Sequence, residues 1–142
     1  MTPEDELIAL NYIAYAMQVP EPTAEEFSAS GFGAMLHLVE DNPSTAWEII
    51  KFLIEHYEEA DYYATTKTDA QTVIGLLAAG PLEDLLSGHG PAFIEEVERN
   101  ASQDRRWAWA LGGVWQFQMN EDIWKRVQRA ADNTWWEKSA PE

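Results

Sequence analysis

Glu83, Asp84 and His89 lie close together in the middle of the chain and have the side chains most often used for proton transfer. No nucleophile or metal-ligand pattern accompanies them, and the three histidines show neither HExxH nor another ligand spacing. The two carboxylates suit the first turn of a helix, where they face unpaired N–H groups. We therefore predict no catalytic residues, no metal site and no cofactor, and keep an enzyme using these three residues as an alternative.

The segment that carries these residues is punctuated by glycine and proline. Gly80 is predicted to end one helix as a left-handed cap, and Pro81 to begin the next, because proline fits the first helical position. Gly88 is predicted to end that short helix, and Gly90 with Pro91 to open a third. Two tight junctions in the segment 75–90 would then set the angles between three successive helices.

Signals for helix starts recur along the rest of the chain. The predicted caps are Thr2, Thr23 with Glu26, Asn42 with Pro43, Thr68 with Gln71, Asp104 and Asn120. No alternating segment is long enough to require a strand. We predict one all-α domain over residues 1–142, an irregular bundle or short solenoid-like stack of about seven or eight helices. The tail 133–142 is expected to fray unless its two tryptophans dock.

The first predicted helix, from about Glu4 to Gln18, is apolar nearly all round. Such a helix is either buried within its own chain or covered by a partner subunit, and we favour burial within the chain. Trp107, Trp109 and Trp115 recur at helical spacing in a later helix, and we predict that they belong to the core rather than to a ligand-stacking site.

Composition limits the location of the protein and the kind of chemistry it can use. With 142 residues and 46% hydrophobic residues the chain is long and apolar enough for one folded domain. It has no cysteine, which excludes disulfides and cysteine-built zinc sites. The N-terminus is acidic rather than basic, and the apolar run Leu7–Met17 is too short to span a bilayer. We expect a cytoplasmic protein outside the membrane.

Negative charge is concentrated in the first half of the chain. Residues 1–64 contain thirteen Asp and Glu against Lys51 alone, a net charge of 1 − 13 = −12. Residues 65–142 contain twelve against eight Lys and Arg, a net charge of 8 − 12 = −4. An acidic body of this kind repels nucleic acid and anionic lipid and attracts cationic proteins. We therefore predict a basic protein partner and no direct binding of nucleic acid.

The expected partner-binding surface is the end of the helix that is predicted to start at Asn42 and Pro43 and to run through Tyr57. Glu58, Glu59 and Asp61 lie at its carboxyl end, where the helix macrodipole disfavours negative charge, so a role other than helix stability is indicated. Tyrosines beside exposed acids are typical of protein interfaces. The predicted binding residues are Glu48, Glu55, Glu58, Glu59, Asp61, Tyr62 and Tyr63. The alternative is that the tyrosines are partly buried and structural.

Two motifs resemble a known family. The runs Gly80-Pro-Leu-Glu-Asp-Leu-Leu86 and Leu111-Gly-Gly-Val-Trp115 resemble a family of small bacterial proteins classed only as a domain of unknown function, over residues 44–130 or so. That resemblance implies a helical domain and supplies no catalytic residues. The short antiparallel helices and the acidic charge also look like bacterial immunity proteins, which is an analogy of fold and charge.

These observations lead to an interaction function. We expect an immunity-type or inhibitor-type protein that neutralises a basic bacterial toxin, such as a nuclease, by direct binding. Besides the enzyme that would use Glu83, Asp84 and His89, a homo-oligomeric scaffold is a second alternative. It would assemble through the apolar first helix, as a homodimer or a larger assembly.

Overall fold

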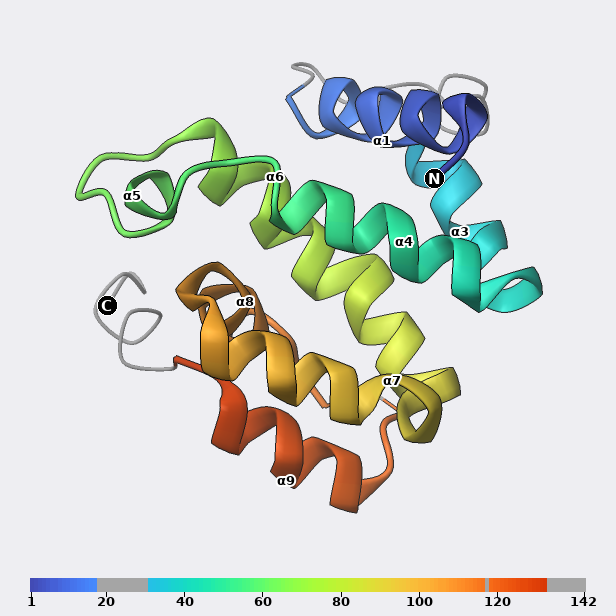
Figure 1. The fold of residues 1–142 in the computed structure, drawn as a ribbon, viewed down its shortest axis with the longest axis vertical. Coiled ribbons are helices and arrows are strands. Elements are labelled where there is room, and N and C mark those ends of the chain that lie inside the picture. The colour runs from blue at the N-terminus through green and yellow to red at the C-terminus, as the bar shows by residue number, and fades with distance from the viewer. Residues whose placement is uncertain (18–30, 117, 133–142) are drawn as a thin grey trace.

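The computed structural model describes residues 1–17, 31–116 and 118–132 (Figure 1). Within these ranges the chain forms helices joined by short connections, and none of these residues lies in a strand. The prediction of an all-α bundle is therefore confirmed. The helix start predicted at Thr23 and the tail predicted for 133–142 lie outside the described residues.

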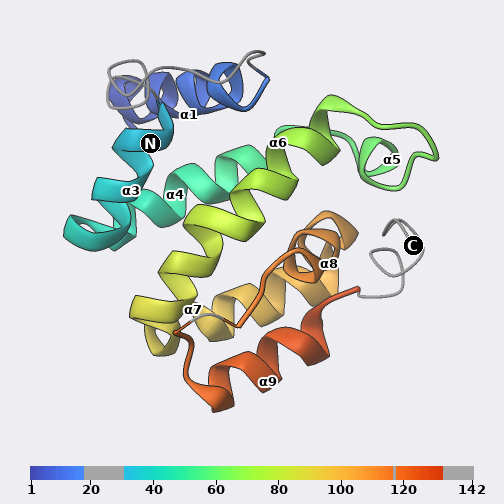
Figure 2. The same cartoon turned by 180° about the vertical axis from the view of Figure 1, so that it is seen from behind.

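The helices form two groups with a shared centre. Their bounds are α1 Pro3–Ala16, α3 Gly31–Asp41, α4 Pro43–Ile54, α5 Glu59–Tyr62, α6 Asp69–Leu77, the π-helical turn η1 Ala78–Leu82, α7 Glu83–Gln103, α8 Arg105–Gly112 and α9 Glu121–Ala130. α1 lies across one end against α3 and α4, and α7, α8 and α9 pack together at the other end (Figures 1 and 2). α4 lies between the two groups and contacts both, and α6 contacts α4 and leads through η1 into α7.

Helix starts follow the predicted caps wherever they are described. A side-chain oxygen of each cap residue accepts a hydrogen bond from a backbone N–H in the first turn, which has no partner within the helix. The confirmed caps are Thr2, Asn42, Thr68, Asp104 and Asn120. These contacts are local in sequence, so the pattern of residues alone identifies them.

The junction predicted at Gly80 and Pro81 is wrong. α6 continues through η1 directly into α7, and both residues lie inside that turn. Each N–H of a π-helical turn points to the carbonyl five residues back, so the wider turn gives the proline ring room that an α-helix lacks. Pro81 and Leu82 are buried, and their packing favours a continuous helical path over a stop at Gly80.

The second predicted junction is a kink rather than a break. α7 continues past Gly88, but His89 has φ −135° and ψ 23°, which are not helical values. Pro91 follows two residues later and has no N–H to donate to the carbonyl of Ser87 one turn back. The missing hydrogen bond and the non-helical residue together bend α7 at this point.

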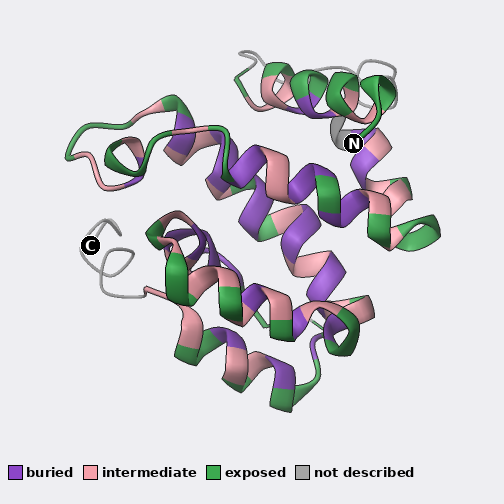
Figure 3. Cartoon of the chain, in the orientation of Figure 1, coloured by how far each residue is buried: buried purple, intermediate pink, exposed green. Residues whose placement is uncertain are grey.

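The core follows α4 and extends into α8 (Figure 3). Trp47 of α4 is buried, and its ring centroid lies 5.2 Å from that of Trp107. Trp107 and Trp109 are core residues, as predicted, but Trp115 is 72% exposed and its predicted burial is wrong. α8 ends at Gly112, so helical spacing no longer sets the direction of residue 115.

α1 is buried on one face only. Ala9 and Tyr12 are fully buried against the neighbouring helices, in line with the expected burial within the chain. Leu7 is 58% exposed and Leu10 47% exposed, because α1 lies at the outer end of the bundle and packs on one side. The prediction of burial is therefore right for the inner face of α1 and wrong for the outer face.

Candidate partner-binding site

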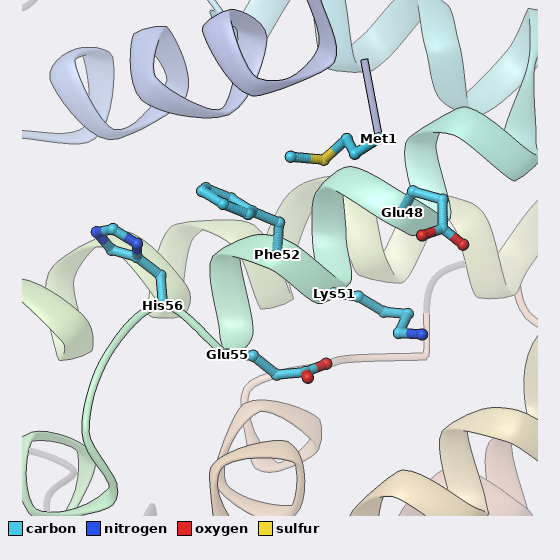
Figure 4. A pocket seen from close by; sticks show the side chains of 6 residues that line it. All are labelled: Met1, Glu48, Lys51, Phe52, Glu55 and His56. Carbon is cyan, nitrogen blue, oxygen red and sulfur yellow. The ribbon is translucent and has the colours of Figure 1, made fainter. Parts of the chain in front are cut away.

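One face of α4 lines a groove of about 440 Å³ beside the start of α1 (Figure 4). Its lining, which we call the α4 groove, consists of Met1, Glu48, Lys51, Phe52, Glu55 and His56. Glu48, Phe52 and Glu55 lie at i, i+4 and i+7, so they share one side of the helix. Two of the residues predicted to bind a partner are thus brought together by α4.

The α4 groove has an apolar centre with charges at its margins. Figure 4 shows the side chains of Met1 and Phe52 facing each other between α1 and α4, with Lys51 extending along α4 between Glu48 and Glu55. Neither of these glutamates forms an ion pair with any described residue. An apolar centre bordered by unpaired carboxylates suits the aliphatic stem and cationic head of a lysine or arginine.

The backbone that follows α4 is fixed by Arg106 of α8. Its guanidinium donates hydrogen bonds to the carbonyl oxygens of Glu55, at 3.1 Å, and Tyr57, at 2.8 Å. The same guanidinium pairs with the carboxylate of Asp104 at 2.8 Å. Burial would raise the pKa of Asp104, but hydrogen bonds from Arg106 hold it below its ordinary value. The groove is therefore bordered by a loop held in one position.

The acids beyond this loop lie at the start of a helix rather than at the end of one. α4 stops at Ile54, and Glu58 is the N-cap of the short helix α5. Glu59 and Asp61 occupy its first turn, where negative charge is favourable. The argument from an unfavourable macrodipole is therefore wrong, because the chain turns and begins a new helix before these acids.

Glu59 already has a partner within the protein. Its carboxylate lies 3.8 Å from the guanidinium of Arg105, and both side chains are more than half exposed. Such surface pairs contribute little to stability and exchange readily with other charges. Glu58 is exposed and has no ion-pair partner among the described residues. Glu58 and Glu59 are thus exposed acids that follow the α4 groove along the chain.

Tyr62 does not reach the surface, which contradicts its predicted contact with a partner. It is fully buried, and its hydroxyl donates a hydrogen bond to the carbonyl oxygen of Ile54. Its ring meets Trp109 edge-on, with centroids 5.4 Å apart. Burial raises the pKa of Tyr62 above its ordinary value. The turn between α4 and α5, which points this residue inward, is not visible in helical periodicity.

Tyr63 is half-buried and is held by three contacts. Its hydroxyl lies 3.0 Å from the carboxylate of Asp132 and 3.1 Å from the carbonyl oxygen of Arg105. The guanidinium of Arg105 lies over its ring, 4.1 Å from the centroid. Burial and the hydrogen bond to Asp132 raise the pKa of the Tyr63 hydroxyl. This tyrosine fits the structural alternative and offers a partner only part of its ring.

A run of aromatic rings connects the α4 groove with the core. Phe52 and His56 have centroids 5.5 Å apart, and His56 meets Tyr57 edge-on at 5.0 Å. Tyr57 in turn lies 6.5 Å from buried Tyr62. Phe52 and His56 were absent from the predicted site, although their i, i+4 spacing with Glu48 and Glu55 nearby could have indicated them.

The alternative catalytic residues separate into two places. Asp84 and His89 line a second cavity, of about 470 Å³, between α3 and α7. Glu83 instead accepts a hydrogen bond from the backbone N–H of Trp115 at 2.8 Å. Burial raises the pKa of both Glu83 and Asp84. The structure thus brings two of the three residues together and assigns Glu83 to the connection that follows α8.

Comparison with protein families matches residues 18–135 to a family of unknown function, DUF6869. The chain belongs to this family. The match is wider than the region of resemblance at 44–130 and includes both motifs that carry it. No curated protein and no solved structure matches the chain.

Most of the α4 groove lies within the part matched to DUF6869. α4 and the loop that follows it fall inside residues 18–135, whereas Met1 and α1 lie before them. Among the described residues of this family member, no three His, Cys, Asp or Glu side chains converge as a metal site would require. No described helix is both long and apolar enough to cross a membrane.

Proposed function

We propose that this DUF6869 protein is an acidic protein-binding module that binds a basic protein through the α4 groove and the exposed acids Glu58 and Glu59 that follow it in the chain. The partner we favour is a cationic bacterial toxin, such as a nuclease, which the protein would neutralise by direct binding. The observation that carries the proposal is the α4 groove itself. It sets Glu48 and Glu55, which have no ion-pair partner in the described part of the chain, around apolar Phe52 on an exposed helix face.

Charge and rigidity support this proposal. The groove belongs to the half of the chain that carries a net charge of −12, so a cationic protein would be drawn to it at long range. Arg106 fixes the loop at one end of the groove through two backbone carbonyls, which reduces the ordering needed on binding. Phe52 would supply apolar contact at the centre, where binding energy concentrates.

The test begins with capture of partners from the source lysate at low and at high salt, followed by affinity measurement with the purified partner. The double variant Glu48→Lys, Glu55→Lys should weaken binding by about tenfold or more, because it sets like charges against the partner. The matched control Glu95→Lys, Glu121→Lys makes the same change of charge at exposed acids of α7 and α9. It should slow association slightly and leave the lifetime of the complex unchanged.

Two results would separate this function from general attraction between opposite charges. A supporting partner is a single basic protein whose toxicity falls when the two proteins are co-expressed and returns with the α4 groove variant. Equal loss of binding in the groove variant and its control would mean that net charge alone is responsible. Unchanged binding in the groove variant would reject the α4 groove as the site.

The two alternatives make different predictions. An enzyme built on Glu83, Asp84 and His89 is disfavoured because Glu83 is bonded to the backbone of Trp115, away from the cavity of the other two. A homodimer would use the outer face of α1, where Leu7 and Leu10 are exposed. Measurement of the solution mass at several protein concentrations tests it, and a monomer throughout would reject it.

A further inference from the structure

The cavity between α3 and α7 lies apart from the α4 groove and has a different lining. Leu36 and Val39 of α3 form an apolar wall. The polar lining consists of Glu40 from α3, Asp84, Ser87 and His89 from α7, and Gln118 from the connection before α9. At about 470 Å³ the cavity is in the range of pockets that hold small molecules.

The lining is negatively charged, and no lysine or arginine is among the described residues that form it. Glu40 and Asp84 both face the cavity, and neither forms an ion pair with a described residue. Burial raises the pKa of Asp84, since its carboxylate has lost water, and no described residue forms an ion pair with it. A positive group inside the cavity would provide the missing interaction.

The α7 kink leaves free space at the cavity wall. The side-chain oxygen of Ser87 is buried and has no hydrogen-bond partner in the described part of the chain. Because this oxygen has almost no accessible surface, it does not open onto the cavity, and only the rest of Ser87 lines the wall. A methyl group added at Gly88 would meet no atom within 4 Å, so the wall beside Ser87 is open.

The spread of the acidic groups selects an extended ligand over a bare metal ion. Glu40, Asp84 and His89 line the same cavity, yet no three such side chains among the described residues converge closely enough to hold a metal. A ligand with a charged end and an aliphatic part would instead contact a carboxylate and the wall of Leu36 and Val39 at once.

We propose that this cavity binds a small aliphatic amine in its ammonium form. The carboxylate of Asp84 accepts hydrogen bonds from the ammonium group, and Leu36 and Val39 contact the alkyl chain. Glu40 lies at the same cavity and adds negative charge, or takes the second ammonium of a diamine. This site is independent of the protein partner proposed for the α4 groove.

The test is a titration of the full-length, ¹⁵N-labelled protein with butylamine and, separately, 1,4-diaminobutane, followed by NMR. Saturable shifts are expected in the backbone amides of residues 36–40 and 84–90. Butan-1-ol and butyrate have the same chain without the positive charge and should cause no saturable change. If the diamine binds more tightly than butylamine, Glu40 contacts its second ammonium group. If the two amines bind equally, Asp84 alone contacts the ligand.

Two variants and one control fix the position of the site. Asp84→Asn should weaken butylamine binding about tenfold or more, because one charged hydrogen-bond acceptor is lost. Gly88→Leu should block the cavity by filling its open wall, and circular dichroism shows whether this variant is folded. Glu121→Gln changes an exposed acid on α9 and should bind as the wild type does.

Three results would overturn the proposal: absence of saturation up to the solubility of both amines, equal binding of butan-1-ol, or unchanged affinity in folded Asp84→Asn. The result is also separable from the proposed function. The double variant Glu48→Lys, Glu55→Lys should lose the protein partner and keep the amine, whereas Asp84→Asn should do the reverse.

Discussion

Arg106 connects two segments that lie far apart in the sequence. Through Asp104 it anchors the start of α8, and through the carbonyl oxygens of Glu55 and Tyr57 it holds the loop between α4 and α5. Its side chain is 24% exposed, so these charged hydrogen bonds lie partly out of water. The geometry of the acidic surface therefore depends on one basic residue beneath it.

Removal of this guanidinium should be costly. Arg106→Gln is expected to lower the free energy of unfolding by about 1.5–3 kcal/mol, the range for hydrogen bonds to charged groups. Urea denaturation measures the change. Arg105→Gln is the matched control, because Arg105 is 63% exposed and its pair with Glu59 contributes about 1 kcal/mol or less. Equal losses in the two variants would contradict the assigned role of Arg106.

The same pair should make part of the stability depend on pH. Because Arg106 holds the pKa of Asp104 below its ordinary value, the folded state binds this proton less readily than the unfolded state. The stabilisation is complete above the unfolded pKa, about 4, and is lost as pH falls through the lower folded pKa. The difference between wild type and Arg106→Gln should therefore narrow in acid, and a constant difference would contradict this linkage.

Asp84 should behave in the opposite way. Its pKa is raised by burial, so the charged form costs stability at neutral pH. Asp84→Asn is expected to raise the melting temperature at pH 7, and the gain should disappear as pH falls through the raised pKa of the wild-type carboxyl. The control is Glu95→Gln, which neutralises an exposed acid and should change the melting temperature little at any pH. A lower melting temperature at pH 7 would show that the carboxylate has a stabilising partner.

At the scale of elements, the contact between α7 and α9 depends on a glycine. Gly90 is buried, and a methyl group there would lie 3.0 Å from a side-chain carbon of Ile123. Gly90→Ala is therefore expected to destabilise the protein by about 1–3 kcal/mol through overpacking. Urea denaturation checks this value against Gly88→Ala, whose methyl meets open space.

Gly88→Ala should be neutral or stabilise by up to about 1 kcal/mol, because alanine loses less backbone freedom than glycine on folding. The two glycines lie two residues apart on α7, so the comparison separates packing from helix propensity. Similar effects in both variants would mean that the close approach of α9 does not limit residue 90.

The elements also show which predictions a sequence supports. Caps at Asn42 and Asp104 were predictable, because each cap residue is close in sequence to the N–H group whose hydrogen bond it accepts. Gly80 and Pro81 carried an equally strong local signal for a stop, yet buried Leu82 and its neighbours keep the chain helical there. Where packing opposes a local signal, only the structure shows which one wins.

At the scale of the whole molecule, fold class and acidity were predictable and the site only partly so. Glu48 and Glu55 were found because helical spacing places them together on α4. Tyr62 was misplaced, because the turn that buries it against Trp109 depends on contacts far apart in sequence. The cavity between α3 and α7 joins Glu40 to Asp84, and no local pattern relates residues so distant along the chain.

The acidic surface should oppose the stability of the fold that carries it. The net charge is −16, and Glu48 and Glu55 share one face without an ion pair to any residue that the structure describes, so the folded state suffers repulsion that the expanded chain relieves. Glu48→Lys, Glu55→Lys is therefore expected to raise the free energy of unfolding at low salt by about 0.5–1 kcal/mol, while it weakens binding of the partner.

Urea denaturation across a sodium chloride series separates this effect from local packing. The Debye length falls from about 30 Å at 0.01 M to about 8 Å at 0.15 M, so the advantage of the double variant should shrink with added salt as wild type gains stability. A double variant less stable than wild type at low salt would mean that Glu48 and Glu55 contribute to the fold. Weaker binding in that variant could then result from loss of the fold, and it would not support an acidic surface that serves to bind a partner.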